Sequence, residues 1–265
     1  YNFIFGTTYP FAASGLHLPV DSLLERDKID VKQFFPAAIQ LSTWEGKLQG
    51  LPLGTHPGWS CMFTNVTEWE KAGAPLPKWE WTYQKEWLAV VQQVHASMNK
   101  GADKKRFGYQ FEYVAQNALL FIRSWGGDWI DPANRSKAVV TSPESVAALA
   151  FMRDLLYKYK VSPTQPETVE QMFINGLVGS WSQGNWNFGT LAKTVGDKFK
   201  WRSFGMPAGP AGRGTFVGVD LFAINSRSKK VDAAWEFGKY MVFDKGAALR
   251  AIPGALPPPA IKKFW

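Results

Sequence analysis

Residues 216–225 read FVGVDLFAIN, a short apolar run that predicts a strand and decides the fold class. A loop rich in proline and glycine, residues 206–214, comes before it, and a polar turn follows. After the turn, apolar residues recur at helical spacing, at Val231, Ala234, Phe237 and Met241. Loop, strand, turn and helix in this order are typical of a chain in which strands and helices alternate.

The rest of the chain repeats this alternation, which predicts the α/β fold class. Strands are expected at residues 59–65, 107–111 and 177–181, and a hairpin is expected at residues 44–53. Helices are expected at residues 31–41, 67–72, 82–94, 114–124, 141–156 and 167–174.

Hydroxyl residues mark two of these helix starts. Thr67 and Thr141 are the expected N-caps, and Glu144 follows Thr141 at the spacing of a capping box. The inner face of the second helix is expected at Val146, Leu149, Met152 and Leu156.

Composition excludes several classes of protein. The chain has 265 residues, enough for one large domain or two smaller ones, and its hydrophobic content of 46% supports a buried core. No run approaches the roughly 18–20 apolar residues of a membrane helix, and no signal peptide is visible. The net charge of +8 is spread over turn-like segments, which favours solvated loops over a nucleic-acid surface. The single cysteine, Cys61, excludes an intrachain disulfide and is expected to be a buried apolar residue.

No cofactor is expected. His17, His56 and His95 lie too far apart in sequence for a metal-ligand spacing, and the chain has no phosphate-binding loop of the P-loop type. The 13 tryptophans are more informative, because an excess of this residue indicates a large aromatic core or stacking platforms for a flat ligand. Pyranose rings have such flat apolar faces.

Several segments, in their order and spacing, resemble the sugar-binding proteins of ABC importers, the maltose-binding-protein family. The segment GKLQGLP, residues 46–52, resembles the hairpin that leads into the first crossing between the two lobes of that family. Residues 216–224 and the helix after them resemble the second crossing. Further matching segments are FAASGL at 11–16, FTN at 63–65, GGD at 126–128, FING at 173–176 and GNW at 184–186.

The resemblance implies a two-lobe, periplasmic-binding-protein-like fold of type II, with lobes joined by hinge crossings. Lobe I would contain residues 1–55, lobe II would contain residues 56–215, and residues 216–265 would return to lobe I. A third crossing is expected near residues 253–258. The βαβ unit that opens the family's fold and the helices that close it have no counterpart in the chain, so only part of lobe I is expected.

The resemblance also implies a sugar site. Such a site needs aromatic rings to cover the C–H faces of the sugar and planar polar groups to bond its hydroxyls. Trp186 matches the tryptophan that stacks on the sugar, with a core position as its alternative. Glu112 and Tyr113 match a segment that offers a carboxylate and an aromatic ring. The remaining expected contacts are Phe3, His56, Trp59, Trp125, Asp128 and Asp220.

The expected function is therefore binding without catalysis. The protein would bind a sugar, an oligosaccharide or glycoside rather than a free monosaccharide, and deliver it to the permease of an ABC transporter. It would act as a monomer in the periplasm or outside the cell, with or without a lipid anchor, and without binding nucleic acid. One alternative stays open, a glycoside hydrolase that uses two facing carboxylates from Glu112, Asp128 and Asp220.

Overall fold

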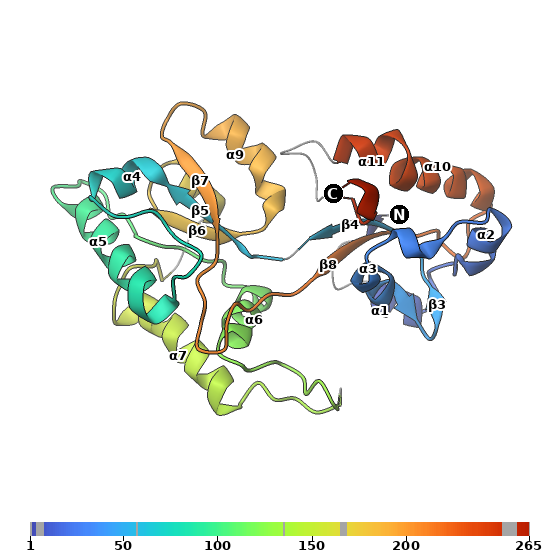
Figure 1. Cartoon of the computed structure of the whole chain (residues 1–265), viewed down its shortest axis with the longest axis horizontal. Helices are drawn as coiled ribbons and strands as arrows, with labels where there is room; N and C mark the ends of the chain where they lie inside the picture. The colour runs from blue at the N-terminus through green and yellow to red at the C-terminus, as the bar shows by residue number, and fades with distance from the viewer. Residues whose placement is uncertain are drawn as a thin grey trace. The chain divides into compact units, whose positions relative to one another are not determined.

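The protein divides into two compact units. The computed structural model describes residues 2–3, 8–56, 58–134, 136–164, 169–250 and 259–264. Unit 1 contains Tyr1–Pro57 and Val217–Trp265, and unit 2 contains Gly58–Phe216 (Figure 1). The chain therefore passes from unit 1 into unit 2 after Pro57 and returns after Phe216. The third crossing expected near residues 253–258 lies outside the described residues.

Unit 1 is built on a three-stranded antiparallel sheet of order β1-β8-β4. Strands β4 (Leu51–His56) and β8 (Gly218–Phe222) are buried along their whole length, and β1 (Asn2–Phe3) pairs with β8. The other elements are α1 (Thr8–Ala13), α2 (Asp21–Arg26), η1 (Val31–Gln33), α3 (Pro36–Leu41), the hairpin β2 (Thr43–Trp44) and β3 (Lys47–Leu48), α10 (Val231–Phe243), α11 (Lys245–Arg250) and η4 (Lys262–Phe264).

Helix α10 lies against the sheet through a glycine. A Cβ at Gly238 would stand 2.6 Å from the ring of Phe222 on β8, so only glycine allows this close approach. The buried face of the helix carries Trp235 and Val242 on either side of Gly238. The sequence places Phe237 among the apolar positions of this helix, but its side chain is mostly exposed. The buried face contains Gly238, the next residue, in its place.

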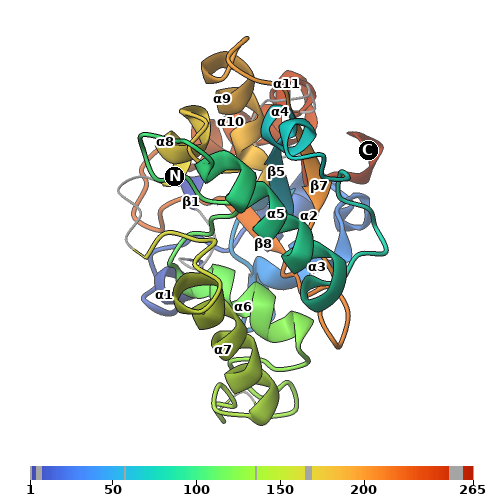
Figure 2. The ribbon, with the colours of Figure 1, turned by 90° about the vertical axis from the view of Figure 1, so that its left-hand side faces the viewer.

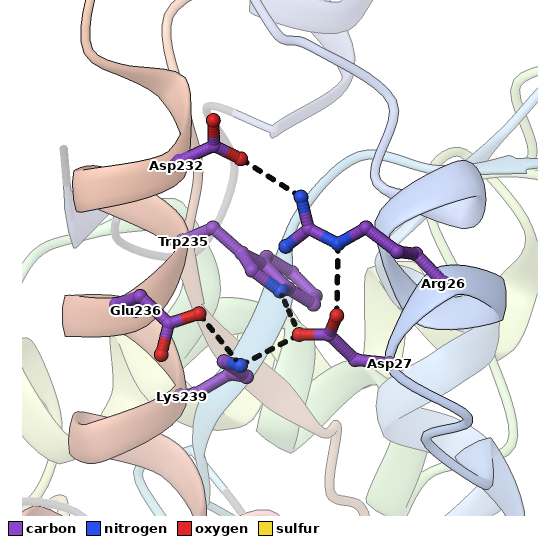
Figure 3. A network of polar contacts seen from close by, with 6 residues as sticks. All are labelled: Arg26, Asp27, Asp232, Trp235, Glu236 and Lys239. Atoms are coloured by element: carbon purple, nitrogen blue, oxygen red, sulfur yellow. Dashed lines mark hydrogen bonds and ion pairs between the residues drawn. The ribbon is translucent and has the colours of Figure 1, made fainter.

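A polar network joins α10 to the C-terminal end of α2 (Figure 3). The carboxylate of Asp27 accepts hydrogen bonds from Arg26 Nε at 2.8 Å, Trp235 Nε1 at 2.8 Å and Lys239 Nζ at 2.6 Å. Arg26 also bonds Asp232 at 2.8 Å. These three donors hold the pKa of Asp27 well below its usual value, and the hydrogen bond from Arg26 has the largest effect. The carboxylate of Asp27 in turn raises the pKa of Lys239.

Unit 2 is built on a second antiparallel sheet, of order β6-β5-β7, with β5 (Cys61–Asn65) between β6 (Ser180–Gln183) and β7 (Trp201–Gly205). Its other elements are α4 (Val66–Lys71), η2 (Tyr83–Trp87), α5 (Leu88–Asn99), α6 (Ala115–Ser124), α7 (Pro143–Tyr157), α8 (Val169–Ile174), η3 (Asn185–Asn187) and α9 (Phe188–Thr194). Figure 2 shows α4 beside α5 and α6 beside α7.

Two apolar cores flank the unit 2 sheet. Neighbouring residues of a strand point to opposite faces, so Met62 and Phe63 on β5 face different cores. Met62 belongs to the larger core, which contains the buried tryptophans Trp69 and Trp87. Phe63 belongs to a smaller core with Trp181. Many of the tryptophans are therefore structural.

Several expected boundaries are wrong at the level of one or two residues. Asn65, not Thr67, caps α4, because its side chain accepts a hydrogen bond from the backbone N–H of Glu68 at 3.1 Å. Ser142, not Thr141, caps α7 in the same way. The expected helix at residues 31–41 is divided into η1 and α3, because Pro36 starts a new helix after an extended residue.

The expected inner face of α7 is right at Met152, which is buried in the larger core, and at Leu156, which packs against that core, but it is wrong at Val146 and Leu149. Val146 is 52% exposed and Leu149 is 39% exposed, whereas Ser145 and Ala148 are fully buried. Ser145 lies against the turn that follows α6: its hydroxyl donates to the backbone oxygen of Asp128, and a Cβ at Gly127 would stand 2.3 Å from that hydroxyl. Residues 107–111 form isolated bridges to β6 and the residues before it instead of a continuous strand.

Candidate functional site

An aromatic and polar cluster in unit 2 is the candidate site, and we call it the Trp59 cluster. It consists of Trp59, Glu112, Gln183, Trp186 and Phe216. Trp59 precedes β5, Gln183 ends β6, and Trp186 lies in the η3 turn that follows. The register of the sheet pairs Cys61 with Gln183, which brings the end of β6 beside the chain that carries Trp59.

Glu112 is the polar centre of the cluster. The indole N–H of Trp59 donates to Oε2 at 2.8 Å, and the amide of Gln183 donates to Oε1 at 2.5 Å. The oxygen of Gln183 in turn accepts a hydrogen bond from the backbone N–H of Gly184 at 2.9 Å. An ionised carboxylate has about four lone-pair sites, so two remain for a ligand that donates hydrogen bonds.

Aromatic rings form the apolar part of the cluster. Trp59 meets Trp186 edge to face, with ring centroids 5.1 Å apart and an interplanar angle of 86°, and it lies 5.8 Å from Phe216. Glycines make room for these rings: a Cβ at Gly58 would stand 2.5 Å from the ring of Phe216, and one at Gly184 would stand 2.0 Å from that of Trp186. Both tryptophans are half-buried, so each keeps surface available to a ligand.

Three other expected site residues of unit 2 contact residues that do not belong to the Trp59 cluster. Trp125 is 8% exposed and packs in the larger core against Tyr83 and Phe151, which leaves little of its ring to cover a ligand. Asp128 forms an ion pair with Arg123 at 3.1 Å. The hydroxyl of Tyr113 donates a hydrogen bond to the backbone oxygen of Pro163.

The expected residues of unit 1 lie on its central sheet. His56 ends β4 and is buried, which lowers its pKa to about 4. Asp220 lies in the middle of β8, also buried, and is paired in register with Gly54. Phe3 pairs with Leu221 through its backbone, and its side chain lies outside the described residues.

Other kinds of site have less support within the part of the chain that the structure describes. In those ranges no three His, Cys, Asp or Glu residues are grouped so that they could hold a metal ion. Burial raises the pKa of the Cys61 thiol, which disfavours the nucleophilic thiolate. Among the described helices, none combines the length and the apolar character that a membrane crossing requires.

Two members of the cluster, Gln183 and Phe216, were missed by the sequence analysis as site residues. Phe216 begins the diagnostic stretch 216–225 but was assigned to a strand, which starts only at Gly218. Gln183 is the polar residue between a buried strand and the Gly184 loop. A polar side chain at the end of a buried strand was the available signal, because burial requires such a group to find partners.

Solved structures share this fold, and one of them is an ABC substrate-binding protein. The protein Lmo0181 from Listeria monocytogenes, in complex with cycloalternan, superposes with a TM-score of 0.87 at 21% identity, covering 99% of this chain and 66% of that chain. Maltose-bound MalE3 from T. maritima gives a TM-score of 0.81 at 22% identity, covering 99% of this chain and 67% of that chain. The expected α/β fold of the maltose-binding-protein type is thus confirmed.

This chain belongs to the bacterial extracellular solute-binding protein family, whose model matches residues 6–263. A curated relative, a probable ABC transporter-binding protein from Deinococcus radiodurans, is 28% identical over 246 residues, which is 86% of this chain. The matched region is 55% of that relative, so the chain spans about half of its length. The family resemblance that the sequence predicted is confirmed.

Proposed function

We propose that this protein binds an oligosaccharide or glycoside outside the cell membrane and delivers it to the permease of an ABC importer. The observation that carries the proposal is the carboxylate of Glu112, held beside the half-buried indoles of Trp59 and Trp186. A carboxylate that accepts hydroxyl hydrogen bonds beside flat aromatic surfaces matches the mixed polar and apolar character of a sugar.

Structural neighbours support a sugar as the ligand: a solute-binding protein from Thermotoga lettingae is bound to the monosaccharide α-D-tagatose, and three others are bound to oligosaccharides. Cycloalternan is bound to the Listeria protein, maltotriose to a maltotriose-binding protein of Thermus thermophilus, and β-1,6-galactobiose to a binding protein of B. animalis. These sugars differ in linkage and size, so they support the class of ligand and leave its identity to experiment.

The proposed mechanism uses the two passages of the chain between the units. Trp59 follows the first passage by two residues, and Phe216 immediately precedes the second. A sugar bound to the Trp59 cluster would favour the conformation that offers it the most contacts, and the permease would recognise that conformation. Sugar contacts by Phe3, His56, Tyr113, Trp125, Asp128 and Asp220 stay predictions, as do the monomeric state and the absence of nucleic-acid binding.

Carbohydrate hydrolysis is a weaker proposal. Both oxygens of Glu112 accept hydrogen bonds from side chains, and Asp128 forms an ion pair with Arg123. Each of these two carboxylates therefore has its own side-chain partners. Asp220 belongs to the other unit. A hydrolase would require two of these carboxylates to face one glycosidic bond.

A sugar panel tests the proposal. Maltotriose, cycloalternan, β-1,6-galactobiose and glucose are added to the full chain, and thermal shift and calorimetry measure binding, since a ligand of the folded state raises the melting temperature. Trp186→Ala should abolish the response, whereas Trp79→Ala, at a tryptophan that is 71% exposed outside the cluster, should preserve it. Chromatography should recover the sugar unchanged. No response to any oligosaccharide, or an equal loss in both variants, would contradict the proposal.

A further inference from the structure

We propose that Gln183 is the positioning residue of the Trp59 cluster: it holds the carboxylate of Glu112 in the one orientation that leaves its free lone pairs to sugar hydroxyls. The predicted effect on sugar affinity rests on the proposed function. Its structural part, the control of the Glu112 carboxylate, can be measured without a sugar.

The backbone fixes which way the amide of Gln183 faces. A backbone N–H can only donate, so the atom that receives the hydrogen bond from Gly184 must be the amide oxygen. The amide nitrogen then necessarily faces Glu112 Oε1. Gln183 is 3% exposed and belongs to β6, so its position is set by the sheet and not by solvent.

The two donors hold opposite oxygens of the same carboxylate. Gln183 binds Oε1 and Trp59 binds Oε2, so the carboxylate cannot rotate about its last bond without breaking one of them. Hydrogen bonds to a charged group are stronger than neutral ones, which makes this arrangement rigid. Trp59 also contacts Trp186 edge to face. A substitution at Gln183 is therefore expected to shift Glu112, then Trp59, and through Trp59 the stacking ring of Trp186.

A second observation supports a polar layer around this carboxylate. Asn117, which is fully buried, donates through its amide nitrogen to the backbone oxygen of Glu112 at 3.3 Å and to the hydroxyl of Ser182 at 3.4 Å. The backbone and the side chain of Glu112 are thus held by separate amides from α6 and β6. Such supporting contacts are what keeps a binding group in a productive geometry.

The substitution Q183E gives a specific test. It replaces a donor by a carboxylate of the same shape, so at neutral pH two negative charges would face each other at hydrogen-bond distance. When the pH falls, the pair takes up one proton, and a carboxyl–carboxylate hydrogen bond replaces the lost amide bond. A purely structural role for Gln183 predicts no such recovery. Q183L removes the donor at every pH.

The first readout is the indole N–H resonance of Trp59 in the sugar-free full chain, labelled with nitrogen-15 and assigned with Trp59→Phe. We expect it to be constant in the wild type from about pH 8 to about pH 5, displaced in Q183L, and displaced in Q183E near pH 8 with a return toward the wild-type position near pH 5. Gln93→Leu, at an exposed amide of α5, is the matched control and should leave the resonance unchanged. An unmoved Trp59 resonance in folded Q183E across this range would overturn the proposal.

The second readout is affinity for maltotriose, cycloalternan and β-1,6-galactobiose. Loss of a hydrogen bond to a charged group should weaken binding by Q183E about 10-fold or more near pH 8, with recovery near pH 5 relative to the wild type. If the Trp59 resonance responds and none of these sugars binds the wild type, positioning stands and the proposed function fails. If a sugar binds the wild type and Q183E with equal affinity at both pH values, the positioning role is wrong and sugar binding stands.

Discussion

The ring of Trp186 lies directly over Gly184, two residues before it in the chain: a Cβ at position 184 would stand 2.0 Å from Cη2 of the indole. Glycine is therefore required by the ring and not by the backbone conformation, which is extended at this residue. The proposed stacking surface depends on the absence of a single carbon atom.

Gly184→Ala should displace the Trp186 ring and weaken oligosaccharide binding about 10-fold or more, since the added methyl cannot coexist with the indole in its present position. Calorimetry with the sugars of the panel measures the effect. The matched control is Gly205→Ala, where the added Cβ would stand 3.0 Å from the exposed ring of Trp79. Equal affinity in Gly184→Ala and the wild type would show that the ring position is irrelevant to binding.

Ser142→Ala should lower the free energy of unfolding by about 1 kcal/mol, because it removes the side-chain acceptor of an N-cap. Thr141→Ala, at the neighbouring hydroxyl residue, should change it by less than about 0.5 kcal/mol, as expected for a surface site without a special contact. Urea denaturation of both variants distinguishes them. A larger effect at Thr141 would assign the cap to the residue that the sequence favoured.

The Asp27 network should make unit 1 sensitive to strong acid. The folded pKa of Asp27 lies below its ordinary value of 3.8, so the network contributes its full stability above that value. As the pH falls further, the unfolded chain takes up a proton before the folded chain does, and this contribution is lost. Asp27→Asn should be less stable at neutral pH and should lose less on acidification. Urea midpoints at several pH values test this, and parallel curves for both proteins would count against it.

His56 should make the protein acid-sensitive in a higher pH range. Burial lowers its folded pKa to about 4, whereas the ordinary value is 6.5. The unfolded chain therefore binds a proton in this interval that the folded chain does not. Stability should be full above pH 6.5 and fall as the pH drops toward 4, by at most about 3 kcal/mol.

His56→Gln separates this effect from that of other groups. Glutamine does not titrate, so the decline between these two pH values should become shallower in the variant. The comparison uses urea midpoints of the two proteins at matched pH. An unchanged slope would mean that His56 does not titrate differently in the folded and the unfolded chain.

Much of the fold could be predicted because it is encoded by local patterns. The stretch at residues 216–225 does contain a buried strand, Gly218–Phe222, followed by the helix Val231–Phe243. Helix α6, at Ala115–Ser124, lies where its pattern placed it. Periodicity and capping depend on residues within a few positions of each other, so the sequence carries them directly.

The faces and the caps were harder to predict. The sequence favoured Val146 and Leu149 as part of the inner side of α7, yet Ser145 and Ala148 are the residues that are fully buried there. Gly127 and Asp128, in the turn that follows α6, contact Ser145 and leave room there only for a small side chain. No pattern within one helix contains that information.

The fold class, the family and several of the aromatic and acidic residues of the candidate site can be inferred from sequence alone. Which of these residues lie in contact depends on how distant segments pack. Glu112 is 53 residues from Trp59 and 71 residues from Gln183. The register of β5 with β6 brings Trp59 beside Gln183, and the bridge from Gln110 to Trp181 brings the segment of Glu112 beside β6. The same packing placed Trp125 in a core. Local patterns specify elements, whereas the pairing of distant elements depends on burial and register across the whole unit, which no short segment specifies.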